Sequence, residues 1–122
     1  MTNEELHFLG IKVVYKDLVD KGYNVMNVRK EFNINPQILA RNKNGQYVLV
    51  VVKTACYPHM GLLVPDVAAN VRHLAQKHQA ICYFASVGIA NANSETEEEM
   101  SKPVLGGEYY INYDGLRPLP SF

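Results

Sequence analysis

Apolar residues recur at intervals of three and four near the start of the chain. The positions that follow this spacing are Leu6, Leu9, Val13, Val14 and Leu18. Such spacing predicts an amphipathic helix, here over about residues 3–21. Thr2 and Glu5 form a capping-box pair at its start, and Gly22 stands where a left-handed cap is expected at its end.

Three apolar stretches follow at residues 23–28, 37–42 and 47–54, and each has the length of a strand. Asn44 and Gly45 lie between the second and third stretches, and this dipeptide is the strongest short signal for a β-hairpin. The third stretch, "YVLVVVKT", is apolar without alternation until Lys53. We therefore expect it to be a central strand that is covered on both faces.

A second helical pattern covers residues 66–78. Its apolar positions are Val67, Val71, Leu74 and Ala75, and Asp66 is the expected N-cap. Another apolar stretch, residues 80–89, follows directly. A buried strand, a helix and a second buried strand predict a right-handed parallel crossover.

The C-terminal part of the chain is less regular. Residues 94–101 predict a short helix with Ser94 and Glu97 as its capping box, residues 108–113 predict an edge strand, and residues 114–122 predict a terminal loop. No repeat or linker interrupts the sequence, so we predict a single domain over residues 1–122. The predicted class is α/β, in the order helix, three strands, helix and strand around a mixed sheet.

The bulk composition narrows the class of protein. Hydrophobic residues make up 48% of the 122 positions, which is enough for a buried core. The 12 basic and 12 acidic residues cancel to a formal net charge of zero. This balance argues against strong non-specific binding to nucleic acid, although it leaves a local basic patch open.

Three features predict a cytoplasmic protein without a membrane segment. Cys56 and Cys82 are not closely paired in the sequence, as expected of reduced thiols. The first ten residues carry acids where a signal peptide carries bases. No apolar run reaches the roughly 18 residues that a membrane helix needs.

The element order, with Lys53 at the end of the third strand, resembles that of the PD-(D/E)xK nuclease superfamily. The spacing of Gly10, Val14, Leu18 and Gly22, followed by "YNVMNVRK" and "PQILARNKNGQYVLVVVKT", is similar to the small bacterial resolvase-like branch. The similarity extends over about residues 8–90. It implies a restriction-endonuclease-like, three-layer core with C-terminal additions.

The same resemblance implies an active site in which carboxylates hold magnesium beside a lysine. Magnesium requires oxygen ligands, and the bound metal activates water for phosphodiester cleavage. The lysine corresponds to Lys53, but the three acidic positions correspond to Ile11, Gln37 and Val51. We therefore expect no metal site, no cofactor and no cleavage from these positions. Lys53 is then either a remnant of the site or a strand-end lysine whose amine reaches water.

An acidic site that has been rebuilt from other residues is the alternative. The candidate carboxylates are Glu4, Glu5, Asp17 and Asp66, and His59 follows Lys53 closely in the sequence. Such a site would bind magnesium and make the chain a metal-dependent DNA endonuclease. The ordinary roles of these acids are capping and helix-dipole interactions in a first helical turn, and solvent exposure for Asp17. The four histidines show no metal-ligand spacing.

Two further predictions concern binding partners. Arg41, Lys43 and Lys53 are the candidate contacts to nucleic acid, with Arg29 and Lys30 nearby in the sequence. Three tyrosines within residues 108–113 make the edge strand a candidate for homodimer formation by strand pairing. The ordinary strand propensity of tyrosine explains the same residues without a dimer.

Three functions therefore remain open. The first is a nuclease-like fold with an eroded active site that acts as a non-catalytic binding or assembly module. The second is a magnesium-dependent endonuclease with a rebuilt acidic site. The third is a protein-interaction domain without a nucleic-acid role. The fold alone does not choose between them, because one fold serves many functions.

Overall fold

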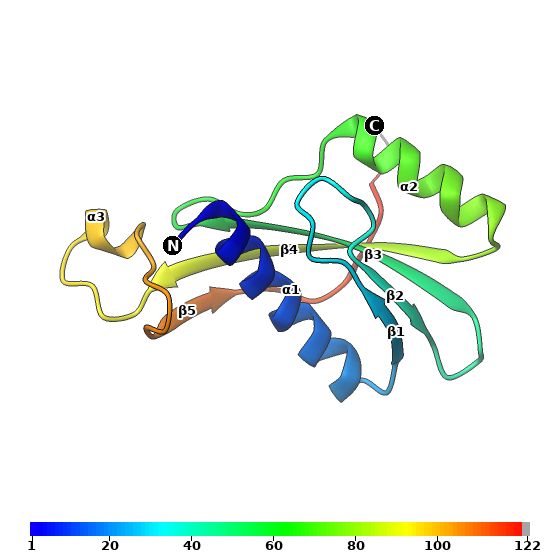
Figure 1. Cartoon of the computed structure of the whole chain (residues 1–122), viewed down its shortest axis with the longest axis horizontal. Coiled ribbons are helices and arrows are strands. Elements are labelled where there is room, and N and C mark those ends of the chain that lie inside the picture. Colours follow the sequence, from blue (N-terminus) through cyan, green and yellow to red (C-terminus); the bar gives the residue numbers. More distant parts are fainter. Residues whose placement is uncertain (121–122) are drawn as a thin grey trace.

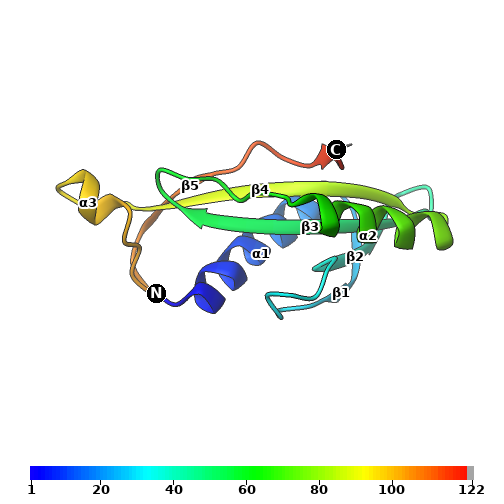
Figure 2. The same cartoon turned by 90° about the horizontal axis from the view of Figure 1, so that it is seen from above.

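The computed structural model describes residues 1–120 and has three layers. A six-stranded sheet forms the middle layer. The helix α1 (Asn3–Asp20) lies against one face of the sheet, and α2 (Pro65–Lys77) lies against the other (Figure 1, Figure 2). The predicted α/β class with a mixed sheet is confirmed. Within residues 1–120, no helix is both long and apolar enough to cross a membrane.

The strands are β1 (Asn24–Val28), β2 (Ile38–Arg41), β3 (Tyr47–Cys56), β4 (Ile81–Asn91), β5 (Tyr109–Asn112) and β6 (Arg117–Pro118). The first five are neighbours in that order, and β6 pairs with the start of β4. β3 and β4 run parallel and are connected through α2, whereas the other paired strands are antiparallel. The chain thus contains a helix, three strands, a helix and a strand in the predicted order.

β3 lies at the centre of the sheet and is covered on both faces, as predicted. Its side chains alternate between the two faces because successive residues of a strand point in opposite directions. Val48, Val50 and Val52 belong to the core beneath α1, and Leu49 and Val51 pack with α2. None of these five side chains is more than 6% exposed.

Both ends of α1 are closed by hydrogen bonds that its sequence predicted. The Thr2 hydroxyl accepts the Glu5 N–H at 3.1 Å, and the Glu5 carboxylate accepts the Thr2 N–H at 2.8 Å. At the other end, the N–H groups of Gly22 and Tyr23 donate to carbonyls of the last turn at 3.0 and 2.9 Å. Gly22 has φ of +88°, so it supplies the left-handed residue that this type of helix ending requires.

Replacing Gly22 by alanine is expected to lower the free energy of unfolding by about 1–2 kcal/mol, because an L-residue is strained at positive φ. The added Cβ would also lie 2.5 Å from Cε of Lys43, whose side chain crosses the glycine. Gly45→Ala is the matched control, since Gly45 has φ of +81° but no atom within 4 Å of its added Cβ. Denaturant unfolding should show a larger loss for Gly22→Ala. Equal losses would mean that the close approach of Lys43 makes no contribution to the destabilisation of Gly22→Ala.

The hairpin between β2 and β3 is confirmed, but its turn differs from a tight Asn-Gly turn. The Asn42 N–H donates to the Gln46 carbonyl at 3.0 Å, which leaves residues 43–45 as the loop. Gly45 has a positive φ, whereas Asn44 does not. This arrangement is the three-residue hairpin loop with glycine in the left-handed position.

The predicted N-cap of α2 is wrong. The cap is Val64, which makes no side-chain hydrogen bond to the helix, and the helix begins with Pro65. Proline suits the first helical position because its missing N–H would have no partner there. Asp66 lies inside the first turn, where its negative charge interacts favourably with the helix dipole.

The C-terminal region contains two further corrections. The short helix α3 (Glu97–Met100) is capped by Thr96, not by Ser94, because the Thr96 hydroxyl accepts the N–H at the third helical position at 3.1 Å. The predicted terminal loop includes β6, which pairs with β4. Residues 121–122 of that predicted loop lie outside the described residues. The edge position of β5 agrees with the prediction.

Candidate functional site

Gln37, at the first position expected to carry an acid, is fully buried just before β2. Its side-chain oxygen accepts the N–H of Val52 at 2.7 Å. Its side-chain nitrogen donates to the Ile34 carbonyl at 3.0 Å and to Oδ1 of Asn35 at 2.8 Å. The amide therefore replaces backbone pairing for β3 just before β2 begins, and it attaches the preceding loop to the sheet.

Val51 and Ile11, at the other two positions, are both core residues. Val51 is fully buried and packs with Val71 and Ala75 of α2. Ile11 is 1% exposed and belongs to the core beneath α1. Neither site is open to solvent, and an aliphatic side chain offers no ligand atom to a metal.

Lys53 is partly buried at the far end of the buried segment of β3. Burial lowers the pKa of its ammonium group. The amine lies 5.8 Å from the ring centroid of Phe32, an exposed aromatic residue in the loop between β1 and β2. Within residues 1–120, no carboxylate oxygen lies within 4.0 Å of this amine.

A cleft of about 440 Å³ surrounds Lys53. His7 of α1 lines it and is only 2% exposed, and its ring meets that of Phe32 edge-on at a centroid distance of 5.2 Å. Within residues 1–120, Nε2 of His7 and Oγ1 of Thr54 are buried without hydrogen-bond partners. No motif in the sequence marks His7 as a functional residue. Its spacing of four from Ile11 is the signal that places it on the buried face of α1.

Replacing Lys53 by methionine is expected to raise the pKa of His7. Burial lowers the pKa of His7 first, the nearby Lys53 ammonium lowers it further, and the Glu31 carbonyl opposes both effects. Because its pKa is depressed on folding, the unfolded chain binds the proton first, and stability falls as the pH drops below about 6.5. The substitution should reduce this loss. Titration of the His7 imidazole by NMR measures the shift.

Lys12→Met is the matched control for that titration, because Lys12 also lies on α1 but its amine stacks on Phe8 at 4.6 Å. It should leave the pKa of His7 unchanged. If the two variants shift this pKa equally, the Lys53 charge does not act on His7 through proximity.

Two of the four candidate acids, Glu5 and Asp17, make specific contacts elsewhere in the fold. Glu5 caps α1, and its hydrogen bonds to Thr2 lower the pKa of its carboxyl group. Asp17 is not a free surface residue, since it accepts from Lys21 at 3.1 Å and from the Tyr113 hydroxyl at 2.7 Å. Within the part of the chain that the structure describes, no three His, Cys, Asp or Glu side chains are grouped to hold a metal.

The predicted nucleic-acid contacts are not brought together. Arg41 stacks on the Tyr47 ring at 4.8 Å and donates to its hydroxyl at 2.8 Å. Lys43 lies in the adjacent hairpin loop, across Gly22. Lys53 is six residues farther along β3 than Tyr47, a separation of roughly 20 Å at the rise of a strand.

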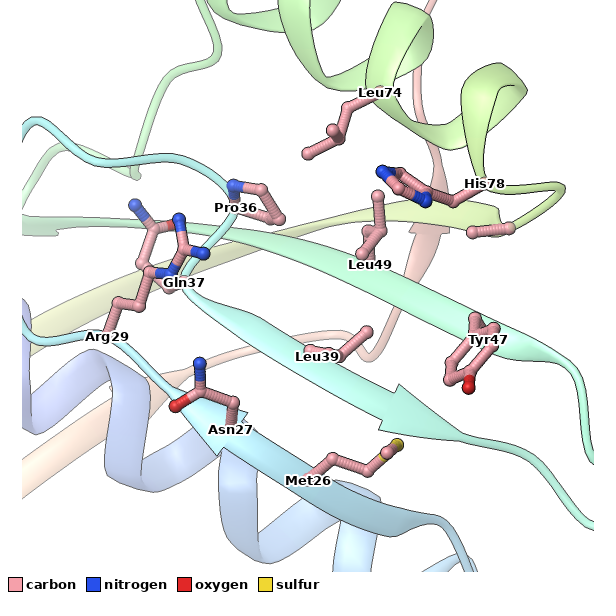
Figure 3. A pocket seen from close by; sticks show the side chains of 11 residues that line it. Met26, Asn27, Arg29, Pro36, Gln37, Leu39, Tyr47, Leu49, Leu74 and His78 are labelled. Atoms are coloured by element: carbon pink, nitrogen blue, oxygen red, sulfur yellow. The ribbon is translucent and has the colours of Figure 1, made fainter.

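A groove of about 420 Å³ lies between α2 and the strands β1, β2 and β3 (Figure 3). α2 packs over β3 and β4, so the same face of β1 and β2 is left open. The side chains that line the groove are mainly apolar, and they come from Met26, Asn27, Arg29, Pro36, Gln37, Leu39, Tyr47, Leu49, Leu74, His78 and Ala80. Figure 3 shows Met26 and Leu39 on the strands facing Leu74 on the helix.

The polar residues that line this groove include Arg29 and His78, and among the described residues they include no acid. Arg29 and Gln37 lie at one end, and His78 extends from α2 (Figure 3). The surrounding sequence is strongly basic, because residues 21–65 contain six lysines and arginines and a single acid, Glu31. Of these bases, Arg29 lines the groove, and Arg41 lies at its edge because it stacks on the groove residue Tyr47.

One family matches the chain. The model of a family described as Domain of unknown function (DUF8840) matches residues 4–119. No curated protein matches the chain.

Proposed function

Because the chain belongs to the DUF8840 family, whose function is unknown, we propose a function from the geometry of its site. The protein is a non-catalytic binding module built on a scaffold like that of the PD-(D/E)xK nucleases. The observation that carries this proposal is the bonding of Gln37. At the position where such a nuclease presents an acid to solvent, the side chain is buried and makes three hydrogen bonds within the fold.

The arrangement around Lys53 supports the nuclease-like ancestry of the scaffold. Lys53 follows the fully buried segment of β3, and Gln37 contacts that segment one residue before it, at Val52. Two of the positions implied by the resemblance are thus close in space. The residues at the three carboxylate positions are buried, and none is acidic: Ile11 and Val51 are aliphatic, and Gln37 is a neutral amide.

The groove of Figure 3 is the binding surface of this module. Met26 on its strand side is 47% exposed, which is unusual for a large apolar residue in a sheet. Apolar grooves with a few polar groups at their ends are typical of sites that bind other molecules. The positive charge of Arg29, without an acid among the described residues of the lining, favours a partner that carries carboxylates.

A protein segment fits this surface better than a nucleic acid. Single-stranded nucleic acids are held by exposed aromatic rings and by cations that follow the backbone. Here the lining is mostly aliphatic, and the Tyr47 ring is already covered by Arg41. A peptide could insert apolar side chains between the aliphatic residues of the groove and pair its carboxylates with Arg29.

Metal binding and cleavage assays test the absence of catalysis. Calorimetric titration with Mg²⁺ and with Mn²⁺ is expected to show no binding heat, and branched and linear DNA should remain intact. An active magnesium-dependent endonuclease run in parallel is the positive control. Metal-dependent cleavage that is lost in Lys53→Ala would overturn the proposal. Binding to an oligonucleotide that weakens steeply with salt would instead identify nucleic acid as the partner.

A further inference from the structure

Acidic side chains are concentrated at one end of β4. This end is the segment between β4 and β5, residues 92–107, which we call the arm. It contains Glu95, Glu97, Glu98 and Glu99 and a single base, Lys102, and Glu108 follows it directly. The groove lies at the other end of β4, and its lining includes Arg29 and no acid among the described residues.

The arm projects from the rest of the fold. Figure 1 and Figure 2 both show α3 beyond the end of the sheet, away from α1 and α2. The arm also exposes apolar side chains, because Val104 is 59% exposed and Leu105 is 65% exposed. A short segment that is both acidic and apolar has the chemistry that the groove would accept.

The arm and the groove of one molecule cannot meet. Ala80 lines the groove, and β4 runs from Ile81 to Asn91, where the arm begins. The 11 residues of β4 extend over roughly 35 Å at the rise of a strand. A contact between these two surfaces therefore requires two molecules.

We propose that the groove of one molecule binds the acidic arm of a second copy of this chain, so that the protein assembles head to tail. This inference rests on the proposed binding function of the groove and names its partner. In the contact, apolar residues of the arm such as Leu105 lie against Met26 and Leu39. The arm glutamates pair with Arg29 and with Arg41 at the edge of the groove.

The charge distribution favours this arrangement over a symmetric dimer. A two-fold interface brings the same patch of both subunits together. At the groove, such a contact would bring the arginines of both copies together, and at the arm it would bring the glutamates together. Strand pairing through β5, the homodimer that the tyrosines suggested, would leave both the groove and the arm uncovered. The head-to-tail contact brings the arm glutamates of one copy to the groove arginines of the other.

Sedimentation velocity of the whole chain tests the assembly. The average mass is expected to rise with protein concentration and to fall as salt is raised from about 0.05 M to about 0.5 M, because salt screens the charge pairs. Met26→Glu in the groove and Leu105→Glu in the arm should each weaken self-association by at least about tenfold, a loss typical of a buried apolar contact. Val19→Glu is the matched control. Val19 is 48% exposed on α1, and its substitution should leave the assembly unchanged.

A mixture of the two variants gives the sharper result. Met26→Glu keeps an intact arm, and Leu105→Glu keeps an intact groove. Together they should form a one-to-one dimer that grows no further, although each alone is monomeric. A wild-type chain that stays monomeric at all concentrations would overturn the proposal, as would a dimer that both variants retain.

The outcomes separate this inference from the proposed function. If the chain is monomeric and neither binds metal nor cleaves DNA, the proposed self-assembly is wrong, but the proposal of a non-catalytic binding module stands. Metal-dependent cleavage removes the proposed function, whatever the state of assembly.

Discussion

Replacing Val51 by aspartate is expected to lower the free energy of unfolding by roughly 4 kcal/mol at neutral pH, because a carboxylate would be buried without a partner. Val51 is 0% exposed, and its side chain packs with Val71 and Ala75. The substitution restores an acid at a position where the nuclease resemblance implies one. We expect it to restore no metal binding, because Gln37 faces other partners. Urea unfolding and calorimetry measure the two effects.

The pH dependence identifies the charge as the cause. Burial raises the pKa of an aspartate, so the folded Val51→Asp variant would hold its proton to a higher pH than the unfolded chain. Its stability should therefore fall as the pH rises above about 3.9, the ordinary pKa of aspartate. Val51→Thr, which has nearly the same shape and no charge, should show a smaller loss without this pH dependence. A Val51→Asp variant as stable as Val51→Thr at neutral pH would contradict the burial argument.

Replacing Gln37 by leucine is expected to lower the free energy of unfolding by about 3 kcal/mol, because buried polar groups would lose their partners. The N–H of Val52 would lose its acceptor, and the oxygens of Ile34 and Asn35 would lose their donor. The loop before β2 would also lose its attachment to β3. Denaturant unfolding gives the loss, and hydrogen exchange at the Val52 amide reports the local change.

Gln37→Glu separates the acceptor role of Gln37 from its donor role. A glutamate can still accept the Val52 N–H, but its ionised form directs a second oxygen toward two oxygens of the loop. We expect this variant to be more stable at a pH where the glutamate is protonated than at neutral pH. The leucine variant should show no such dependence. If Gln37→Leu unfolds like the wild type, the three hydrogen bonds do not hold the loop.

These two positions are the reason why we propose binding and not catalysis. A metal site needs carboxylates that are exposed to the metal and to water. Gln37 instead lines the groove, and Val51 packs in the same cluster as the groove residues Leu39, Leu49 and Leu74. Residues at positions where the resemblance implies carboxylates thereby support the surface that we propose as the binding site.

Much of the fold could be predicted from local patterns. The helical spacing of Leu6, Val14 and Leu18 identified α1, because one face of a helix must be apolar to pack on a sheet. The unbroken apolar run of "YVLVVVKT" identified the central strand, because a strand that is covered on both faces must be apolar on both. Gly22 marked the end of the helix, since it is suited to positive φ. These features depend on residues that are close in the sequence.

The errors at the helix caps have a different cause. Asp66 and Ser94 are good capping residues, but Pro65 and Thr96 stand nearer to the helix starts that the fold selected. The start of a helix depends on where the packed chain leaves the preceding loop. Capping preference alone decides only between positions that are otherwise equal.

The sequence by itself determined the elements, the buried faces and the absence of acids at Ile11, Gln37 and Val51. Only the tertiary structure decided how distant residues meet. It buried His7 beside Lys53, paired Asp17 with Tyr113 across 96 positions, and placed an apolar groove with Arg29 and an acidic arm at opposite ends of β4. The spacing of apolar residues along the sequence indicates which side of a helix or strand is buried. The contacts of a polar side chain depend on long-range packing, which no local pattern encodes.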